Sequence, residues 1–106
     1  MFTIPNSRID FRNFLVEKTG IEYLYFQPPE SIKMSYPAII YSISRVNHKF
    51  ADNNKYLRFT AYQLILIDKD PDSEFFYKLL DLPMCSYTGT SYQKDNLNHY
   101  IFTIYY

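Results

Sequence analysis

The fold of this chain is decided by residues 66–83, LIDKDPDSEFFYKLLDLP, where a strand, a turn and a helix follow one another. The stretch begins as the end of a strand, the run DKDP predicts a turn, and Pro83 stops the short helix that follows. Asp68, Asp70 and Asp72 alternate through the turn. They raise the question of whether this is a metal or catalytic site, or only the start of a helix.

The three acids match the first half of a calcium-binding EF-hand loop, but the rest of the motif is missing. That loop needs a glycine after the third acid and a glutamate six residues later, and this chain has Ser73 and Leu79 there. A helix start explains more: Asp70 is placed to cap, Pro71 suits the first helical position, and acids favour the positive end of the helix dipole. We therefore predict a helix over residues 71–82 and no metal site.

Working outward, the sequence predicts a first helix that Asn6 or Ser7 can cap and that ends near Thr19, with Gly20 as its stop. Its expected core-facing stripe is Ile9, Phe11, Phe14 and Leu15. Strands are predicted over residues 21–27, 37–46, 56–68, 84–93 and 97–106, with a polar hairpin loop at 47–55 and a turn at 94–96.

The order of these elements indicates a fold class. Neighbouring strands imply antiparallel pairing, and the segment 56–68 is apolar on both faces near its end, which places it centrally. We predict one domain over residues 1–106, an α+β two-layer sandwich. It has a mainly antiparallel sheet of four to five strands with two helices on one face.

Composition argues against several functions. The 106 residues have a formal net charge of zero, whereas nucleic-acid binders usually show a basic excess or patch. Two glycines exclude a glycine-rich phosphate loop. His48 and His99 form no zinc-binding pattern, and no nucleophile motif appears. We expect no enzyme, no cofactor and no metal.

Cys85 is the only cysteine, so it cannot form an internal disulfide, and we predict a small buried or half-buried residue. No signal peptide and no apolar run of ~20 residues is present. We expect a soluble protein made in a reducing cytoplasm.

Residues 45–58 are the most suggestive segment. Cations and aromatic rings alternate there, around one acid, Asp52: the residues are Arg45, His48, Lys49, Phe50, Lys55, Tyr56, Arg58 and Phe59. The pattern fits a solvated hairpin, a protein–protein contact or a nucleic-acid surface with stacking rings.

The last strand, HYIFTIYY (99–106), is aromatic on both faces. One side shows Tyr100, Phe102, Ile104 and Tyr106; the other shows His99, Ile101, Thr103 and Tyr105. A bare edge strand this apolar would invite aggregation, so another subunit or a second helix should cover it. The 12 tyrosines suit protein interfaces as well as strands with one face exposed to solvent.

Four groups of residues resemble the tail terminator, or head–tail joining and tail completion, proteins of long-tailed bacteriophages and prophages. They are Tyr36-Pro37 opening a strand, FADN (50–53), DKDPDS (68–73) and DNLNH (95–99). The likeness covers nearly the whole chain, and its motifs are structural rather than catalytic.

The resemblance implies an α+β fold with helices on one side of a sheet, and a homohexameric ring in the virion, assembled in the host cytoplasm. Such a ring caps the tail tube, ends its polymerisation and meets the head–tail connector protein. Its partners are therefore further copies of itself, the tail tube protein and the connector, with genomic DNA passing through the lumen without sequence-specific binding and with no membrane. Our interface candidates are Arg45, His48, Lys49, Phe50, Asp52, Lys55, Arg58, Tyr105 and Tyr106. The alternatives are a neighbouring head completion (stopper) protein and a small nucleic-acid-binding domain that uses the 45–58 segment.

Overall fold

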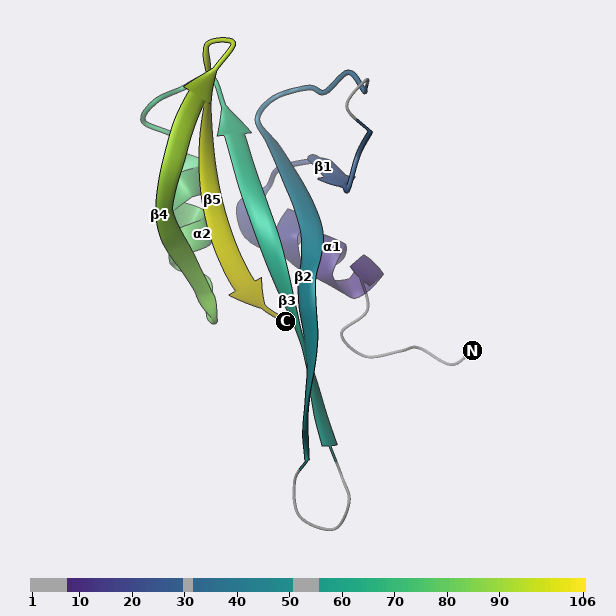
Figure 1. Ribbon diagram of the computed structural model, residues 1–106. Coiled ribbons are helices and arrows are strands. Elements are labelled where there is room, and N and C mark those ends of the chain that lie inside the picture. The colour runs from purple at the N-terminus through teal and green to yellow at the C-terminus, as the bar shows by residue number, and fades with distance from the viewer. Residues whose placement is uncertain (1–7, 30–31, 51–55) are drawn as a thin grey trace.

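The computed structural model describes residues 8–29, 32–50 and 56–106; for residues 45–50 and 56–59 the description is of the backbone. Within these ranges the chain forms a five-stranded sheet, in the order β1-β2-β3-β5-β4, and two helices on one of its faces (Figure 1). The elements are α1 (Arg8–Thr19), β1 (Tyr23–Phe26), β2 (Ala38–Phe50), β3 (Tyr56–Asp68), α2 (Glu74–Leu80), β4 (Cys85–Lys94) and β5 (Leu97–Tyr105). The predicted α+β fold is confirmed.

Strand pairing agrees with the prediction except at one edge. β1 runs parallel to β2, whereas the other neighbours in the sheet are antiparallel. β3 is the central strand, as its apolar sequence predicted. β4 and β5 are joined at Asp95 and Asn96, whose φ angles of 54° and 63° are those of a tight hairpin turn.

Helix α1 ends where the sequence predicted but presents a narrower face to the core. Gly20 adopts a φ of 80°, and its N–H donates to the carbonyl of Val16 at 2.9 Å. Phe11 and Leu15 are fully buried, whereas Ile9 is 65% exposed. The prediction for Ile9 was wrong because residues two apart lie about 200° apart around a helix. The candidate caps Asn6 and Ser7 lie outside the described residues.

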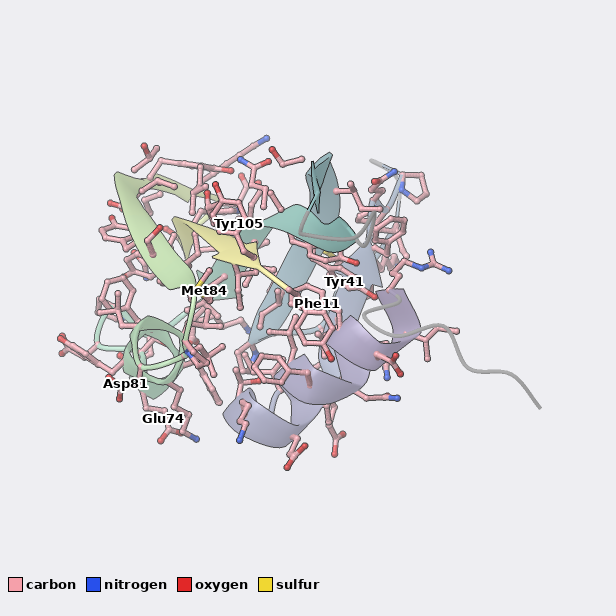
Figure 2. The ribbon with its side chains drawn as sticks, turned by 90° about the horizontal axis from the view of Figure 1, so that it is seen from below. Phe11, Tyr41, Glu74, Asp81, Met84 and Tyr105 are labelled. Atoms are coloured by element: carbon pink, nitrogen blue, oxygen red, sulfur yellow. The ribbon has the colours of Figure 1, made fainter. Side chains whose placement is uncertain are left out.

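Aromatic rings form much of the core between helices and sheet. Phe11 stacks on Tyr62 with ring centroids 4.0 Å apart and meets Tyr41 edge-on at 5.9 Å; Figure 2 shows Phe11 and Tyr41 between α1 and the strands. Under α2, the ring of Phe76 lies within 5.4 Å of the rings of four other aromatic residues, Tyr77, Tyr87, Tyr100 and Phe102. The two helices are therefore fixed to the same face of the sheet by ring contacts.

Helix α2 begins later than predicted, and its cap is a different residue. The side-chain oxygen of Ser73 accepts the N–H of Phe75 at 3.3 Å, which makes Ser73 the N-cap. Asp68 and Asp70 instead accept the N–H groups two residues ahead, at 3.1 and 2.9 Å. Such Asx turns hold the backbone out of a helix, so Asp70 is not the cap, Pro71 lies in the turn, and the helix is Glu74–Leu80.

Candidate interaction surfaces

The long hairpin of β2 and β3 extends beyond the rest of the sheet. Its strands stay paired from Ala38↔Ile67 to Phe50↔Tyr56, whereas β5 pairs with β3 only over residues 61–68. Residues 45–50 and 56–60 therefore form a two-stranded ribbon, here named the arm (Figure 1). In the described part of the chain no third segment pairs along the arm, except at its base, where the backbone of Thr60 bonds to Tyr106. A β-bulge between Ile43 and Arg45 marks its base.

The arm corrects the predicted loop at 47–55, because β2 continues through Asn47, His48 and Lys49 to Phe50. Backbone hydrogen bonds between strands do not depend on side-chain polarity, so a polar run can continue a ladder that its pattern would assign to a loop.

The arm brings together most of the predicted interface residues. Arg45, His48, Lys49 and Phe50 lie on β2, and Arg58 lies on β3 opposite His48. Asp52 and Lys55, the other two candidates of this segment, lie outside the described residues. Residues 45–60 contain four Lys or Arg residues and one acid. The arm region is thus basic although the chain is neutral.

The C-terminal candidates separate onto the two faces of the sheet. Tyr106 is half-buried, and its ring lies 5.1 Å from that of Phe11 and 5.3 Å from that of Phe14. Its ring therefore contributes to the chain's own core. Its backbone forms two hydrogen bonds with Thr60, at 3.0 and 3.3 Å, which anchor the base of the arm. Tyr105 is half-buried on the face away from the helices (Figure 2).

The last strand is not an edge strand, so the expectation that a bare apolar edge would need to be covered is corrected. β5 lies between β3 and β4, and Phe102 and Ile104 are buried on the helix-covered face. The opposite face carries a stripe of three half-buried isoleucines that pair across the strands: Ile40 with Ile65, and Ile65 with Ile101. We name it the isoleucine stripe.

The two edges of the sheet are poor templates for further strands. β1 has four residues, and β4 is broken by an irregularity between Tyr87 and Ser91, where Gly89 has a φ of 84°. Short or bulged edges discourage pairing with another chain. The arm and the open face are therefore better placed than the edges to meet another molecule.

A pocket of about 200 Å³ lies at the end of the sheet opposite the arm, and no sequence pattern predicted it. It is lined by Pro71, Asp72, Ser73, Phe76, Tyr77 and Tyr100. The hydroxyl of Tyr100 donates to the carbonyl of Pro71 at 3.2 Å. Burial first, then the negative charge of Tyr87 and of Asp68, Asp72 and Asp70, raises the pKa of Tyr100. Alternation along β5 predicted that Tyr100 shares a side with Phe102 and Ile104, but no local pattern placed it beside the acidic turn.

The remaining residues with reactive or metal-binding side chains are held by burial and by contacts within the fold. Cys85 is half-buried, as predicted, and burial raises the pKa of its thiol to about 11. The ring of His99 stacks on that of Tyr92 at 4.5 Å, and its Nδ1 lies 3.1 Å from the carbonyl oxygen of Leu97. Among residues 8–29, 32–50 and 56–106, no group of three His, Cys, Asp or Glu residues could hold a metal ion. Neither of the two described helices is long and apolar enough to cross a membrane.

Comparison with known proteins assigns no family: no family model matches the chain and no curated protein matches it. We therefore infer function from these surfaces and from the resemblance in the sequence.

Proposed function

We propose that the protein is a virion structural protein that caps the phage tail tube as a ring, ends tube polymerisation and joins the tail to the head connector. The observation that carries the proposal is the arm, a two-stranded ribbon that leaves the folded body. The α+β fold with both helices on one face agrees with what the resemblance implies.

The arm suits assembly because a two-stranded ribbon is only marginally stable alone in water. Its six β2 residues, Arg45–Phe50, span about 20 Å at about 3.3 Å per residue. A ribbon of that reach can contact a neighbouring subunit and gain the cover that its own chain does not supply in the described residues.

The open face of the sheet offers a second contact surface. The isoleucine stripe is apolar and only half-buried, and half-buried Tyr25 and Tyr105 lie on the same face by strand alternation. Large apolar and tyrosine side chains are enriched at the cores of protein interfaces. An arm and a face at different places on one subunit favour a heterologous contact, which closes into a ring when the rotation permits.

The proposed partners are five further copies in a homohexamer, the tail tube protein below the ring and the head–tail connector above it. Genomic DNA passes through the lumen without sequence-specific binding, a role that suits a chain of zero net charge. The site of action is the virion tail at the head–tail interface, after assembly in the host cytoplasm.

The test combines the solution mass, measured by light scattering, with co-sedimentation on tail tubes of the phage or prophage that encodes the chain. A closed ring of about six subunits in negative stain, bound at tube ends, is the expected result. Arg45→Glu with Lys49→Glu should abolish joining while the circular dichroism spectrum stays unchanged. The matched control is Lys18→Glu with Lys33→Glu, two exposed lysines outside the arm. Normal infectious particles from the arm variant, or no binding of the wild type to tube ends, would contradict the proposal.

Two alternatives predict different partners. A head completion protein would bind the purified connector and leave tube ends free. A nucleic-acid-binding domain is favoured by the basic residues of the arm, and it would shift a labelled oligonucleotide with an affinity that falls steeply as salt rises.

A further inference from the structure

We propose that the open face of the sheet, on the side away from the helices, packs against the same face of a second copy of the chain. The two copies are related by a two-fold axis, and the isoleucine stripe of one lies on that of the other. The inference comes from the face itself and does not rest on the proposed function. A face covered in this way is closed to a ring neighbour, so the pair describes the free protein and has to part before the face enters a ring.

The centre of the open face carries no charged side chain. Gln63, Ile65 and Ile67 of β3 lie on it, together with the residues that follow in the same rows across β2, β1, β5 and β4. None of these residues is Asp, Glu, Lys or Arg. The ladder positions of Arg45 and Lys94 lie beyond these rows, toward opposite ends of the sheet. A sheet face that meets water is normally polar, so an uncharged centre rich in isoleucine indicates a face that another molecule covers.

The open face is rigid at its margins. Tyr23 on β1 and Tyr92 on β4 lie at its two edges, and each is 45% exposed. The ring of Tyr92 stacks on that of His99 at 4.5 Å. The hydroxyl of Tyr25, beside the isoleucine stripe, accepts the N–H of Ser35 at 3.1 Å. Side chains that are already held in place lose little entropy on association. Figure 1 shows both helices behind the sheet, with the open face toward the viewer.

The open face is large enough for a specific pair. Five strands at a spacing of about 4.8 Å make it about 24 Å wide. Pairing of β3 with β5 over residues 61–68 makes it about 27 Å long, at about 3.4 Å per residue. Two such faces together present about 1,300 Å², above the ~1,000 Å² that a specific interface needs. This is the small end of the range, so we expect a dissociation constant in the micromolar range.

A second copy is the occupant that these properties favour. An uncharged surface offers nothing to the phosphate groups of nucleic acids or of anionic membranes. A twisted sheet is complemented by another sheet of the same twist, packed about 10 Å away. A second copy supplies such a sheet, and because the centre of the face has no charge, it meets its own image without like-charge repulsion.

The first test changes the centre of the face. Ile65→Lys places an ammonium group in the apolar contact, opposite the same group of the other copy, and should weaken the pair by about tenfold or more in sedimentation equilibrium. The matched control is Ile9→Lys, the same change at an isoleucine of α1 that is 65% exposed, and it should pair as the wild type does. Circular dichroism checks that both variants are folded. Raising salt from about 0.1 M to about 1 M should not weaken the wild-type pair, because its centre has no charges to screen.

A chemical cross-link gives a second readout that preserves the uncharged face. Ile65 lies in the middle of the isoleucine stripe on the central strand, so Ile65→Cys places a thiol near the two-fold axis. Because packed sheets lie about 10 Å apart, a short bismaleimide should join two copies through this position. Ile9→Cys is the matched control and should give little covalent dimer. The native Cys85 is half-buried against the core on the other face, so the wild type should give none.

A wild type that stays monomeric across the micromolar range, or an Ile65→Lys variant that pairs as tightly as the wild type, would overturn the face-to-face pair. A pair that dissociates as salt rises would do the same. If Ile65→Lys unfolds, the cross-link decides, and an Ile65→Cys variant that gives no more covalent dimer than Ile9→Cys overturns the pair. Tube binding on the same samples identifies a different occupant: a monomeric wild type whose binding to tube ends is lost in Ile65→Lys uses this face for the tail tube protein instead.

Discussion

The face of α1 that packs on the sheet can be tested by comparing two apolar residues near the start of the helix. Phe11 is fully buried, stacked on Tyr62 at 4.0 Å, while Ile9 is 65% exposed. Both belong to the core-facing stripe that the sequence predicted. Substituting each in turn therefore tests whether the predicted stripe or the observed packing describes α1.

The expected magnitudes differ widely. Phe11→Ala removes a fully buried ring and leaves a cavity, at a cost of about 3–5 kcal/mol. Since small domains have only about 5–15 kcal/mol of stability, Phe11→Leu is the milder companion. It should cost about 1–2 kcal/mol, because the ring stacking is lost but most of the volume is kept. Ile9→Ala should change the free energy of unfolding by no more than about 0.5 kcal/mol, because most of the side chain is already in water.

The assay is urea denaturation followed by circular dichroism, with a thermal scan of the same samples. Phe11→Leu should lower the melting temperature by about 4–8 °C, taking about 4 °C per kcal/mol for a domain of this size. Ile9→Ala should leave it nearly unchanged. If Ile9→Ala destabilises the protein as much as Phe11→Leu, α1 packs with a different face and the reasoning is refuted.

Three further predictions concern single elements. Ser73→Ala removes the N-cap of α2 and should lower the free energy of unfolding, measured in urea, by about 1 kcal/mol. Asp70→Asn keeps an acceptor for the turn and should lower it by less than about 0.5 kcal/mol. Equal losses of stability in the two variants would argue for Asp70 as the cap. The thiol of Cys85 should react with iodoacetamide at pH 8 about a hundredfold more slowly than in the unfolded chain, because a pKa of about 11 keeps it protonated. The reaction rate should rise about tenfold per pH unit up to pH 10. A rate that does not depend on pH would contradict this. Gly89→Ala should destabilise the fold by about 1 kcal/mol through its φ of 84° alone, since nothing lies within 4 Å of an added Cβ; an unchanged urea midpoint would show that the bulge relaxes.

The candidate surfaces were predictable only in part. The alternation of cations and rings in residues 45–58 marked the region of the arm, and the two faces of β5 were assigned correctly from the period of a strand. The pocket could not be predicted from the sequence, because its lining comes from three separate places: the turn at 71–73, helix α2 and Tyr100 on β5. Residues about 29 positions apart meet there only because β5 pairs with β3, which brings Tyr100 opposite Leu66.

The sequence by itself determined what acts over a few residues. Helical spacing and Gly20 set the end of α1, Asp95 and Asn96 set the last hairpin turn, and runs rich in β-branched and aromatic residues set the approximate positions of the strands. Together these local signals were enough for the α+β class and for a central position of β3.

Only the tertiary structure decided the order of the strands, the interior position of β5 and the length of the arm. Each depends on hydrogen bonds or packing with partners elsewhere in the chain. β2 continues through a polar run because β3 supplies its ladder. Ile9 stays in solvent because the sheet accepts only the face that holds Phe11 and Leu15. Local sequence patterns describe what a segment favours, whereas burial and pairing are properties of the whole fold.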